Sequence, residues 1–351
     1  MRILKIGYVP ISNTLNSPGD KRRFVYYANK KNYNFEIASF DKFYDIVILT
    51  QNADISIWSK YKNKYKNSII IYDLIDSYLS IPKYNIKGLF RGLAKFIVGQ
   101  NKHLQFNYWK SIEKMCSVSD AVICSTIEQK NIISRFNNNV HIILDAHFEL
   151  TKKIKKSYSI NSTFKIVWEG LPHTLDSLKV LKKVLTKLDS DLLIEFHVIT
   201  DLKYKKYMGL IGQIDTYSKL KKYYKNVYIH EWTQENCSNI ITSCDLAVIP
   251  IDINDEFSMG KPENKLLLFW RMAIPVICSS TPAYIRAMEL ADLNLIANCE
   301  QEWHDKILEL ISDEVMRKEV GLKAKMYTEQ FHSESILISK WDLLFKSLNL
   351  K

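Results

Sequence analysis

Short runs of β-branched and aliphatic residues recur along this chain of 351 residues, and stretches long enough for a helix separate them. Most runs are continuously apolar, as at residues 68–72 and 245–250, which is typical of parallel strands covered on both faces. Between the runs, apolar residues take helical spacing, as over residues 175–188. This alternation predicts an α/β fold of doubly wound parallel sheets.

The runs fall into two sets on either side of a polar, lysine-rich stretch. The expected strands lie near residues 2–9, 34–39, 45–50, 68–73, 120–125 and 140–144, and then near 164–169, 192–200, 226–230, 244–250, 275–279 and 293–297. We therefore predict two Rossmann-like domains, over residues 1–150 and 164–325, joined by a linker or hinge at 151–163. The remaining residues, 326–351, are expected to form a helix that packs back towards the first domain.

Charge and cysteine usage narrow the class of protein. The net charge is +11, and residues 1–150 carry +9 of it, with 21 Lys and Arg against 12 Asp and Glu. A basic first half favours an anionic partner such as a membrane surface, a phosphorylated lipid or nucleic acid. The six cysteines lack Cys-x-x-Cys spacing, which favours reduced thiols over a zinc site or disulfides. No signal peptide or membrane-spanning run is expected, so we predict a cytoplasmic protein.

The most informative motif follows the strand expected at 244–250. A polar loop leads to a helix expected to begin near Pro262, since proline suits the first helical turn. Lys261, Asn264 and Lys265 then lie at a helix N-terminus, where backbone N–H groups and the dipole favour an anion such as a diphosphate. The alternative is a solvated helix start, in which Lys and Glu are common.

This passage resembles the donor-binding segment of GT-B glycosyltransferases of the family 1/4 type. In that family a Lys-Pro-x-Asn-Lys loop leads a helix that ends in a turn similar to residues 275–277. Residues 165–170 resemble the first strand and glycine loop of the donor domain, and residues 226–235 resemble the segment that faces the nucleotide base. Residues 120–125 and 140–145 are similar to the last strands of the acceptor domain, so the resemblance covers nearly the whole chain.

The resemblance implies two Rossmann-like domains facing across a cleft, with a nucleotide-sugar donor bound by the second. It assigns donor binding to Gly170, His173, Trp232, Thr233, Lys261, Glu263, Asn264 and Lys265. Lys265 would also act in catalysis, by stabilising the departing diphosphate. Gly260 and Leu268 stand where many retaining members carry acidic residues, so Glu263 or another group is left to hold the ribose.

The first domain contributes the acceptor side of this hypothesis. Its first loop and helix start contain Gly19, Asp20, Arg22 and Arg23, where positive charge crowds against the helix dipole unless an anion relieves it. The alternative is that these side chains extend into solvent. Asp76 follows a strand and is placed as a general base for the acceptor hydroxyl, the alternative being a carboxylate that caps a turn.

Residues 81–110 contain six Lys or Arg and no acid. Lys83, Lys87, Arg91 and Lys95 are spaced by four and would form one basic stripe on a helix, which favours an anionic membrane surface. The alternative is an ordinary surface helix that faces the core. No Asp-x-Asp pair is placed for a metal-bound diphosphate, and the histidines lack ligand spacing, so no metal and no cofactor are expected.

Together these features predict a metal-independent glycosyltransferase that moves a sugar from a nucleotide donor to a glycan or lipid-linked acceptor in surface polysaccharide or glycolipid assembly. We place it in the cytoplasm, peripheral to the inner face of the plasma membrane. The alternatives are a sugar-nucleotide epimerase, a degenerate GT-B-fold binding protein and a nucleic-acid binder. The last has no recognised nucleic-acid module to support it. The donor sugar, base, acceptor and stereochemical outcome stay open.

Overall fold

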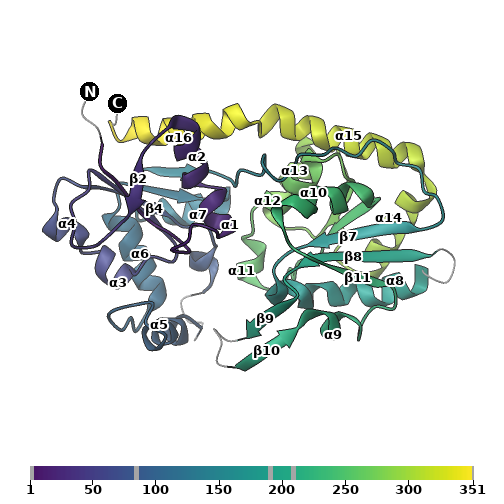
Figure 1. Cartoon of the computed structure of the whole chain (residues 1–351), viewed down its shortest axis with the longest axis horizontal. Helices are drawn as coiled ribbons and strands as arrows, with labels where there is room; N and C mark the ends of the chain where they lie inside the picture. Colours follow the sequence, from purple (N-terminus) through teal and green to yellow (C-terminus); the bar gives the residue numbers. More distant parts are fainter. Residues whose placement is uncertain (1–3, 83–86, 189–192, 207–210, 350–351) are drawn as a thin grey trace. The chain divides into compact units, whose positions relative to one another are not determined.

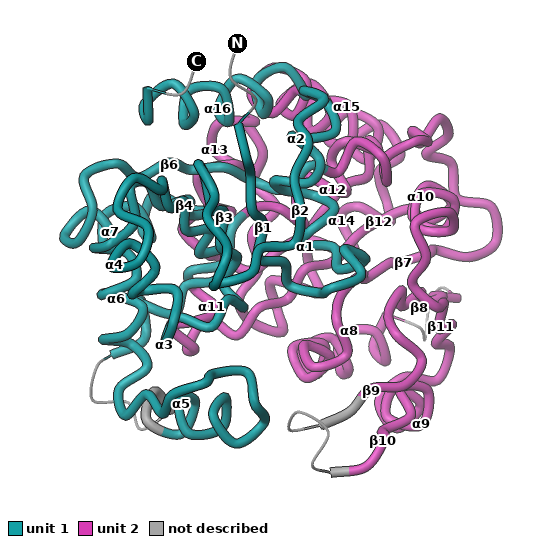
Figure 2. Tube along the Cα trace, turned by 60° about the vertical axis from the view of Figure 1, so that its left-hand side comes forward, with its two compact units in different colours: residues 1–146, 260–262, 334–351 teal, residues 147–259, 263–333 magenta. Residues whose placement is uncertain are grey.

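The computed structural model describes residues 4–82, 87–188, 193–206 and 211–349. The chain divides into two compact units. Unit 1 comprises residues 1–146, 260–262 and 334–351, and unit 2 comprises residues 147–259 and 263–333 (Figure 2). The predicted boundary after residue 150 therefore lies four residues beyond the end of the first segment of unit 1.

Unit 1 contains a parallel sheet whose strand order is β2-β1-β3-β4-β5-β6 (Figure 1). Its strands are β1 (Ile6–Val9), β2 (Phe35–Ile37), β3 (Ile46–Thr50), β4 (Ile69–Asp73), β5 (Ala121–Cys124) and β6 (Val140–Ile142). Each overlaps a run expected from the sequence, because continuous apolar runs suit strands buried on both faces. The order reverses between β1 and β3, which makes this the topological switch point, where ligands bind in open α/β sheets.

Helices connect these strands and supply the rest of unit 1. They are α1 (Pro18–Lys21), α2 (Phe24–Lys31), α3 (Ile55–Trp58), α4 (Tyr61–Lys64), the 3₁₀ helix η1 (Tyr78–Ser80), α5 (Lys87–Ile97), α6 (Tyr108–Val118), α7 (Ile127–Ile133) and α16 (Glu334–Ser347). In the last of these, Trp341 stacks on Tyr27 with ring centroids 5.3 Å apart, and the hydroxyl of Tyr27 donates to Asp342 at 2.9 Å. The C-terminal helix is thereby anchored to α2.

Unit 2 contains a second parallel sheet, in the order β11-β8-β7-β12-β13. Its strands are β7 (Phe164–Glu169), β8 (Ile194–Thr200), β11 (Val227–Glu231), β12 (Leu246–Ile249) and β13 (Val276–Cys278). This is the Rossmann order, with its switch point between β7 and β12. The two doubly wound parallel sheets predicted from the sequence are confirmed.

Two details of the strand prediction are wrong. Residues 293–297 form no named strand, and only Ile296 makes an isolated bridge to Cys278. An antiparallel pair, β9 (Lys203–Lys206) and β10 (Ile211–Asp215), was not expected. Its lysine-rich first strand lacks the apolar run that marks the strands of the main sheets.

The helices of unit 2 surround its sheet. They are the 3₁₀ helix η2 (Pro172–Val180), α8 (Leu181–Leu188), α9 (Thr216–Leu220), α10 (Gln234–Ser243), α11 (Glu256–Met259), α12 (Asn264–Arg271), α13 (Pro282–Leu290), α14 (Glu300–Ser312) and α15 (Glu314–Phe331). The predicted C-terminal segment 326–351 is thus split, because α15 belongs to unit 2 and α16 to unit 1.

The predicted hinge at 151–163 lies within unit 2 and is partly buried there. The ammonium of Lys155 donates to the carbonyl of Cys244 at 2.8 Å and lies 3.2 Å from a carboxylate oxygen of Asp245. The hydroxyl of Tyr158 donates to the carbonyl of Ala273 at 2.7 Å. These buried contacts hold the segment in place, so its polar composition does not make it a free linker.

Candidate functional site

Gly170 directly follows β7, at the switch point of the unit 2 sheet. Its N–H donates to the carbonyl of Ile199 at 3.1 Å, which continues the pairing with β8. A Cβ atom built on Gly170 would lie 2.6 Å from the Nζ of Lys265 and 2.7 Å from the ring of Trp168. The residue must therefore be glycine unless its neighbours move, because Cβ contacts under 3.0 Å are essentially never seen.

Lys265 brings a positive charge to this point. It lies in the first turn of α12, and its ammonium is 4.9 Å from the ring centroid of Trp168, within range of a cation–π interaction. The helix begins at Asn264, two residues after the expected Pro262, and Glu263 at its N-cap makes no side-chain capping bond. A lysine, a helix N-terminus and a side-chain-free glycine thus meet at one edge, an arrangement suited to a diphosphate.

The other predicted donor residues lie at the same carboxyl edge. His173 is exposed in η2, after Gly170. Trp232 follows β11, and its backbone N–H donates to the carbonyl of Thr200 at 3.1 Å. The hydroxyl of Thr233 accepts from the N–H of Asn236 at 3.1 Å and so caps α10. The hydroxyl of Thr233 therefore has a structural role.

Thr200 was missed by the sequence analysis. It is the last residue of β8, lies between the ends of β7 and β11, and is almost completely buried. Within the described part of the chain its hydroxyl has no hydrogen-bond partner. Since buried polar groups are normally paired, this hydroxyl marks a place for a water molecule or a ligand group. The sequence signal is a threonine at the end of an apolar run.

The structure leaves no place for an acidic side chain at Gly260 or Leu268, the two positions at which many retaining GT-B glycosyltransferases carry one. Leu268 is buried in α12, where a carboxylate would be left without water. Gly260 belongs to unit 1, and its carbonyl accepts from the hydroxyl of Ser77 at 2.6 Å. A Cβ on Gly260 would lie 2.1 Å from that hydroxyl, so an acidic side chain does not fit. Lys261, in the same three-residue segment, is likewise part of unit 1.

In unit 1, Asp76 is held by a residue that the sequence analysis did not single out. Gln51 follows β3, next to the switch point, and its side-chain amide donates to a carboxylate oxygen of Asp76 at 2.8 Å. In return, the N–H of Asp76 donates to the side-chain carbonyl of Gln51 at 2.9 Å. The hydroxyl of Tyr78 lies 3.3 Å from the same carboxylate oxygen. These bonds fix the carboxylate at the carboxyl edge of the sheet.

Asp20 and Gly19 do not form the predicted anion site. Asp20 is fully buried, and its carboxylate accepts from the hydroxyl of Tyr8 at 2.7 Å and from the N–H groups of Ile11 and Ser12 at 2.8 and 3.0 Å. Gly19 packs so closely that a Cβ would lie 2.4 Å from the side chain of Ile11. Both residues therefore shape the loop after β1, which corrects their placement as acceptor ligands.

Arg23 was also placed on the acceptor side, and this prediction is wrong. Its side chain is buried and makes a two-pronged ion pair with Asp73, with nitrogen–oxygen distances of 2.7 and 2.6 Å. Another guanidinium nitrogen donates to Asp145 at 3.0 Å and to the carbonyl of Ile143 at 2.9 Å. The interior carboxylates relieve the conflict that the sequence attributed to an external anion. Arg22, beside it, is half-buried.

Only two residues of the predicted basic stripe, Arg91 and Lys95, have described side chains, and these two do not form a basic surface. Lys83 and the side chain of Lys87 lie outside the described residues. Arg91 packs its guanidinium 4.1 Å from the ring centroid of Tyr78, and Lys95 is 4% exposed with its ammonium 5.0 Å from the ring centroid of Tyr108. In the described part of α5, the basic side chains thus face the interior of unit 1.

Among the described residues, no group of three or more His, Cys, Asp or Glu is arranged to hold a metal ion. One histidine pair occurs in unit 2, where Nδ1 of His197 lies 2.9 Å from Nε2 of His230 and Nε2 of His197 lies 3.2 Å from Glu195. Burial lowers the pKa of both rings. In the same described ranges, no helix is long and apolar enough to cross a membrane.

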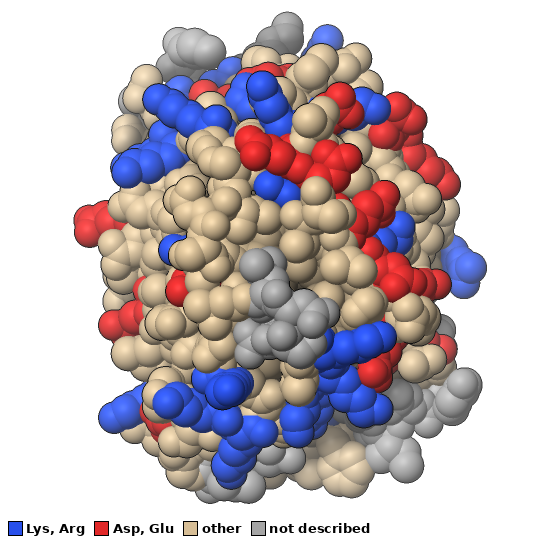
Figure 3. All heavy atoms as spheres, turned by 90° about the vertical axis from the view of Figure 1, so that its right-hand side faces the viewer, with Lys and Arg blue, Asp and Glu red and all other residues tan. Residues whose placement is uncertain are grey.

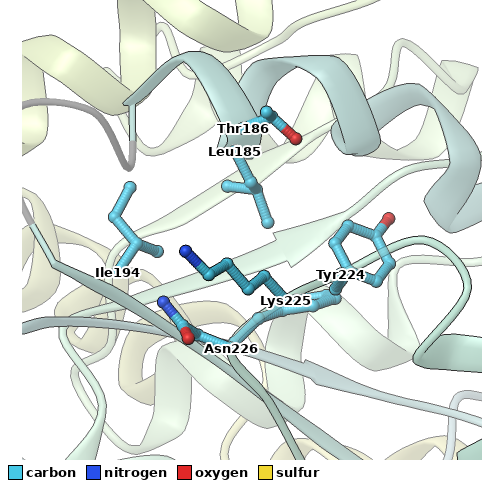
Figure 4. A pocket seen from close by; sticks show the side chains of 7 residues that line it. Leu185, Thr186, Ile194, Tyr224, Lys225 and Asn226 are labelled. Carbon is cyan, nitrogen blue, oxygen red and sulfur yellow. The ribbon is translucent and has the colours of Figure 1, made fainter.

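A small pocket occurs away from the carboxyl edge (Figure 4). It is lined by Leu185, Thr186, Ile194, Phe196, Tyr224, Lys225 and Asn226. Ile194 begins β8 and Asn226 precedes β11, so the pocket lies at the amino ends of these strands. Ligands of open α/β sheets bind at the opposite ends, and this pocket therefore belongs to the packing of α8 against the sheet.

Figure 3 shows one face of the molecule by charge. Lys and Arg gather along its lower part and again at the upper left, and most Asp and Glu lie above the middle and to the right.

No protein-family model and no curated protein matches this sequence. Solved structures do match. The chain is 9% identical to HepE from Anabaena, in a complex with UDP and glucose, with a TM-score of 0.67 over 99% of both chains. It is 18% identical to TarM from S. aureus, with a TM-score of 0.57 over 92% of this chain and 58% of that one. This chain thus spans a little over half the length of TarM.

These similarities, together with the two strand orders, decide the fold. The chain has the GT-B fold. A UDP-N-acetylglucosamine 2-epimerase from Listeria monocytogenes, described by its structure's authors as putative, matches at 10% identity and a TM-score of 0.57 over 99% of this chain and 97% of that one. The fold alone therefore does not separate a transferase from the epimerase named above as an alternative.

The buried position of Lys95 makes stability depend on pH. Burial, and to a lesser extent the charge of Arg91, lowers the pKa of Lys95 from its ordinary value of 10.5 to about 8. The unfolded chain therefore binds more protons than the folded chain between pH 8 and 10.5, so stability contributed at this site rises with pH across that window. Lys95→Met should stabilise the protein at pH 7 by about 1–3 kcal/mol, a gain that narrows towards pH 10.5.

Chemical denaturation at several pH values measures this effect. Lys110→Met, at an exposed position in α6, is the matched control and should change stability little at any pH. A Lys95→Met variant that is destabilised at pH 7, or whose effect is independent of pH, would show that Lys95 is solvated.

Proposed function

We propose that this protein is a glycosyltransferase that moves a sugar from a nucleotide diphosphate donor to a glycan or lipid-linked acceptor in surface polysaccharide or glycolipid assembly. The contact of Lys265 with Gly170 and Trp168 carries the proposal. Transfer breaks the bond between the sugar and the diphosphate, and negative charge develops on the departing oxygen. Lys265 and the N-terminus of α12 stabilise that charge from a fixed position, without reorganisation during the reaction.

The donor residues we infer are those of unit 2 at the carboxyl edge. Gly170 leaves room for Lys265 and Trp168 beside the backbone, so that the ammonium can meet a diphosphate there. The hydroxyl of Thr200 is available to a ligand group or water. Trp232, at the end of β11, is placed to contact the base. Glu263, at the N-cap of α12, is our candidate for holding the ribose, because Gly260 and Leu268 offer no carboxylate.

In unit 1, we infer that Asp76 acts as general base for the acceptor hydroxyl. The carboxylate is half-buried and already oriented by Gln51, so its position is set before the acceptor binds. General-base catalysis requires such a carboxylate within hydrogen-bond reach of the reacting hydroxyl. Gln51 is therefore a positioning residue in this account.

The solved structures support the choice of donor. HepE has been captured with UDP and glucose, and TarM with UDP, α-GlcNAc-glycerol and fondaparinux. We infer a UDP-sugar donor for this chain by that similarity of fold. We expect no metal and no separate cofactor, and we place the protein in the cytoplasm, peripheral to the inner face of the plasma membrane.

A sugar-nucleotide epimerase is the second candidate, because the epimerase from Listeria shares the fold. The two activities separate cleanly in one experiment. A transferase releases UDP in proportion to acceptor added, whereas a 2-epimerase converts UDP-N-acetylglucosamine to its C2 epimer with no acceptor present. Product analysis of UDP-N-acetylglucosamine incubations by NMR spectroscopy distinguishes them.

Lys265→Ala should weaken UDP binding by about 10- to 100-fold, because a charge-assisted contact with the diphosphate is lost. Isothermal titration calorimetry with UDP measures the change. Lys222→Ala removes an exposed lysine from the same unit and should leave affinity unchanged. Equal affinity for UDP in wild type and Lys265→Ala would remove the donor site from this position.

Asp76→Asn should lower the rate of UDP release from a UDP-sugar by about 10²- to 10⁴-fold while UDP affinity stays the same. The amide keeps the size and the contact with Gln51, so the fold should be preserved. Asp41→Asn, at an exposed carboxylate of unit 1, is the control. Turnover in Asp76→Asn equal to wild type would return Asp76 to the role of a structural cap.

A further inference from the structure

Helix α5 presents several large apolar side chains to solvent. Phe90, Leu93 and Ile97 are spaced as i, i+3 and i+7 and therefore lie on one helical face. Phe90 and Ile97 are 65% and 68% exposed, and Leu93 and Phe96 are also exposed. A surface helix of a globular protein ordinarily turns such a face towards the core.

The exposed face continues beyond the helix. Val98 follows α5 directly, and Phe106, in the loop before α6, is 77% exposed. We call this set the α5 surface: Phe90, Leu93, Phe96, Ile97, Val98 and Phe106. Single exposed apolar residues are common in soluble proteins, but a contiguous group of large ones marks an interaction site.

Packing inside unit 1 fixes this orientation. A Cβ on Gly92 would lie 1.9 Å from the carbonyl oxygen of Gln105, so this side of α5 touches the following loop at backbone distance. Lys95 and Arg91 lie on the inner side, with their charges over the rings of Tyr108 and Tyr78. If the helix turned its apolar face inward, a residue with a side chain would take the place of Gly92. That side chain would clash with the backbone carbonyl of Gln105.

The chain segment that carries this surface is basic in sequence. The segment 81–110 has no acidic residue, and Lys102, Lys110 and Lys114 are exposed close to Phe106 in the chain. Of the nearby carboxylates, Asp54 accepts from the N–H groups of Ser56 and Lys102, at 3.0 and 2.7 Å. Large apolar side chains bordered by lysines are complementary to a bilayer with anionic headgroups, because the rings enter the acyl region while the ammonium groups stay at the phosphates.

We propose that the α5 surface inserts into an anionic membrane. Binding rests on burial of Phe90, Ile97 and Phe106 in the interface, and exposed lysines add attraction to the headgroups. This differs from the stripe predicted by the sequence, because Arg91 and Lys95 take no part in it. The proposal does not depend on the proposed enzymatic activity.

Sedimentation with vesicles tests the proposal, with equal parts of phosphatidylglycerol and phosphatidylcholine or phosphatidylcholine alone. Wild type should bind the mixed vesicles, and the triple variant Phe90→Ser, Ile97→Ser, Phe106→Ser should lose at least about tenfold in partitioning. The matched control is Leu290→Ser, Val315→Ser, Met326→Ser, which removes three side chains of unit 2 with similar exposure. Its partitioning should equal that of wild type, and circular dichroism should show that both variants are folded.

Three results would overturn the proposal. The first is wild type that does not sediment with mixed vesicles. The second is undiminished binding by the triple variant, particularly if added salt abolishes it, since that would indicate adsorption by lysines alone. The third is a wild-type dimer in light scattering that becomes monomeric in the triple variant without any vesicle binding, which would assign the surface to a second copy of the chain.

Discussion

Lys265 and Trp168 lie close to the backbone of Gly170, and the proposed donor site depends on this contact. The three residues come from two separate segments, β7 with its following loop and the first turn of α12, and the order of the unit 2 sheet places both at its switch point. The ammonium lies over the indole ring, and the absence of a side chain at Gly170 leaves room for both groups beside its backbone. A change in any one of them alters the place where a diphosphate would bind.

In unit 1, charged side chains near the first loop pair with one another inside the protein. Arg23, which follows the first loop and helix α1, pairs with Asp73 and Asp145 inside the protein, and Asp20 ties the loop after β1 to Tyr8. Buried charges require such partners, because removing one would leave the other without water. At the carboxyl edge of the sheet, Asp76 and Gln51 offer a carboxylate and an amide, which suit a hydroxyl better than a phosphate.

Much of the architecture could be predicted from the sequence, because continuous apolar runs such as residues 68–72 have few alternatives to a central parallel strand. The motifs single out Gly170 and Lys265, and the structure brings the two together; their role in donor binding is our proposal. The burial of Arg23 and Lys95 could not, because it depends on carboxylates and rings from distant segments. Their charge predicts an exposed position from the sequence, whereas the structure buries both side chains. Gln51 and Thr200 belong to no recognisable motif, so their place in the site could not be predicted from the sequence.

Hydrogen–deuterium exchange of the whole protein, with and without UDP, reports where the nucleotide binds. We predict slower exchange in peptides covering residues 169–174, 231–236 and 263–268, with the amides at the start of α12 most affected. Protection confined to residues 185–186 and 224–226, which line the pocket at the opposite strand ends, would contradict this prediction. So would binding of UDP with no protection in any of the three predicted segments.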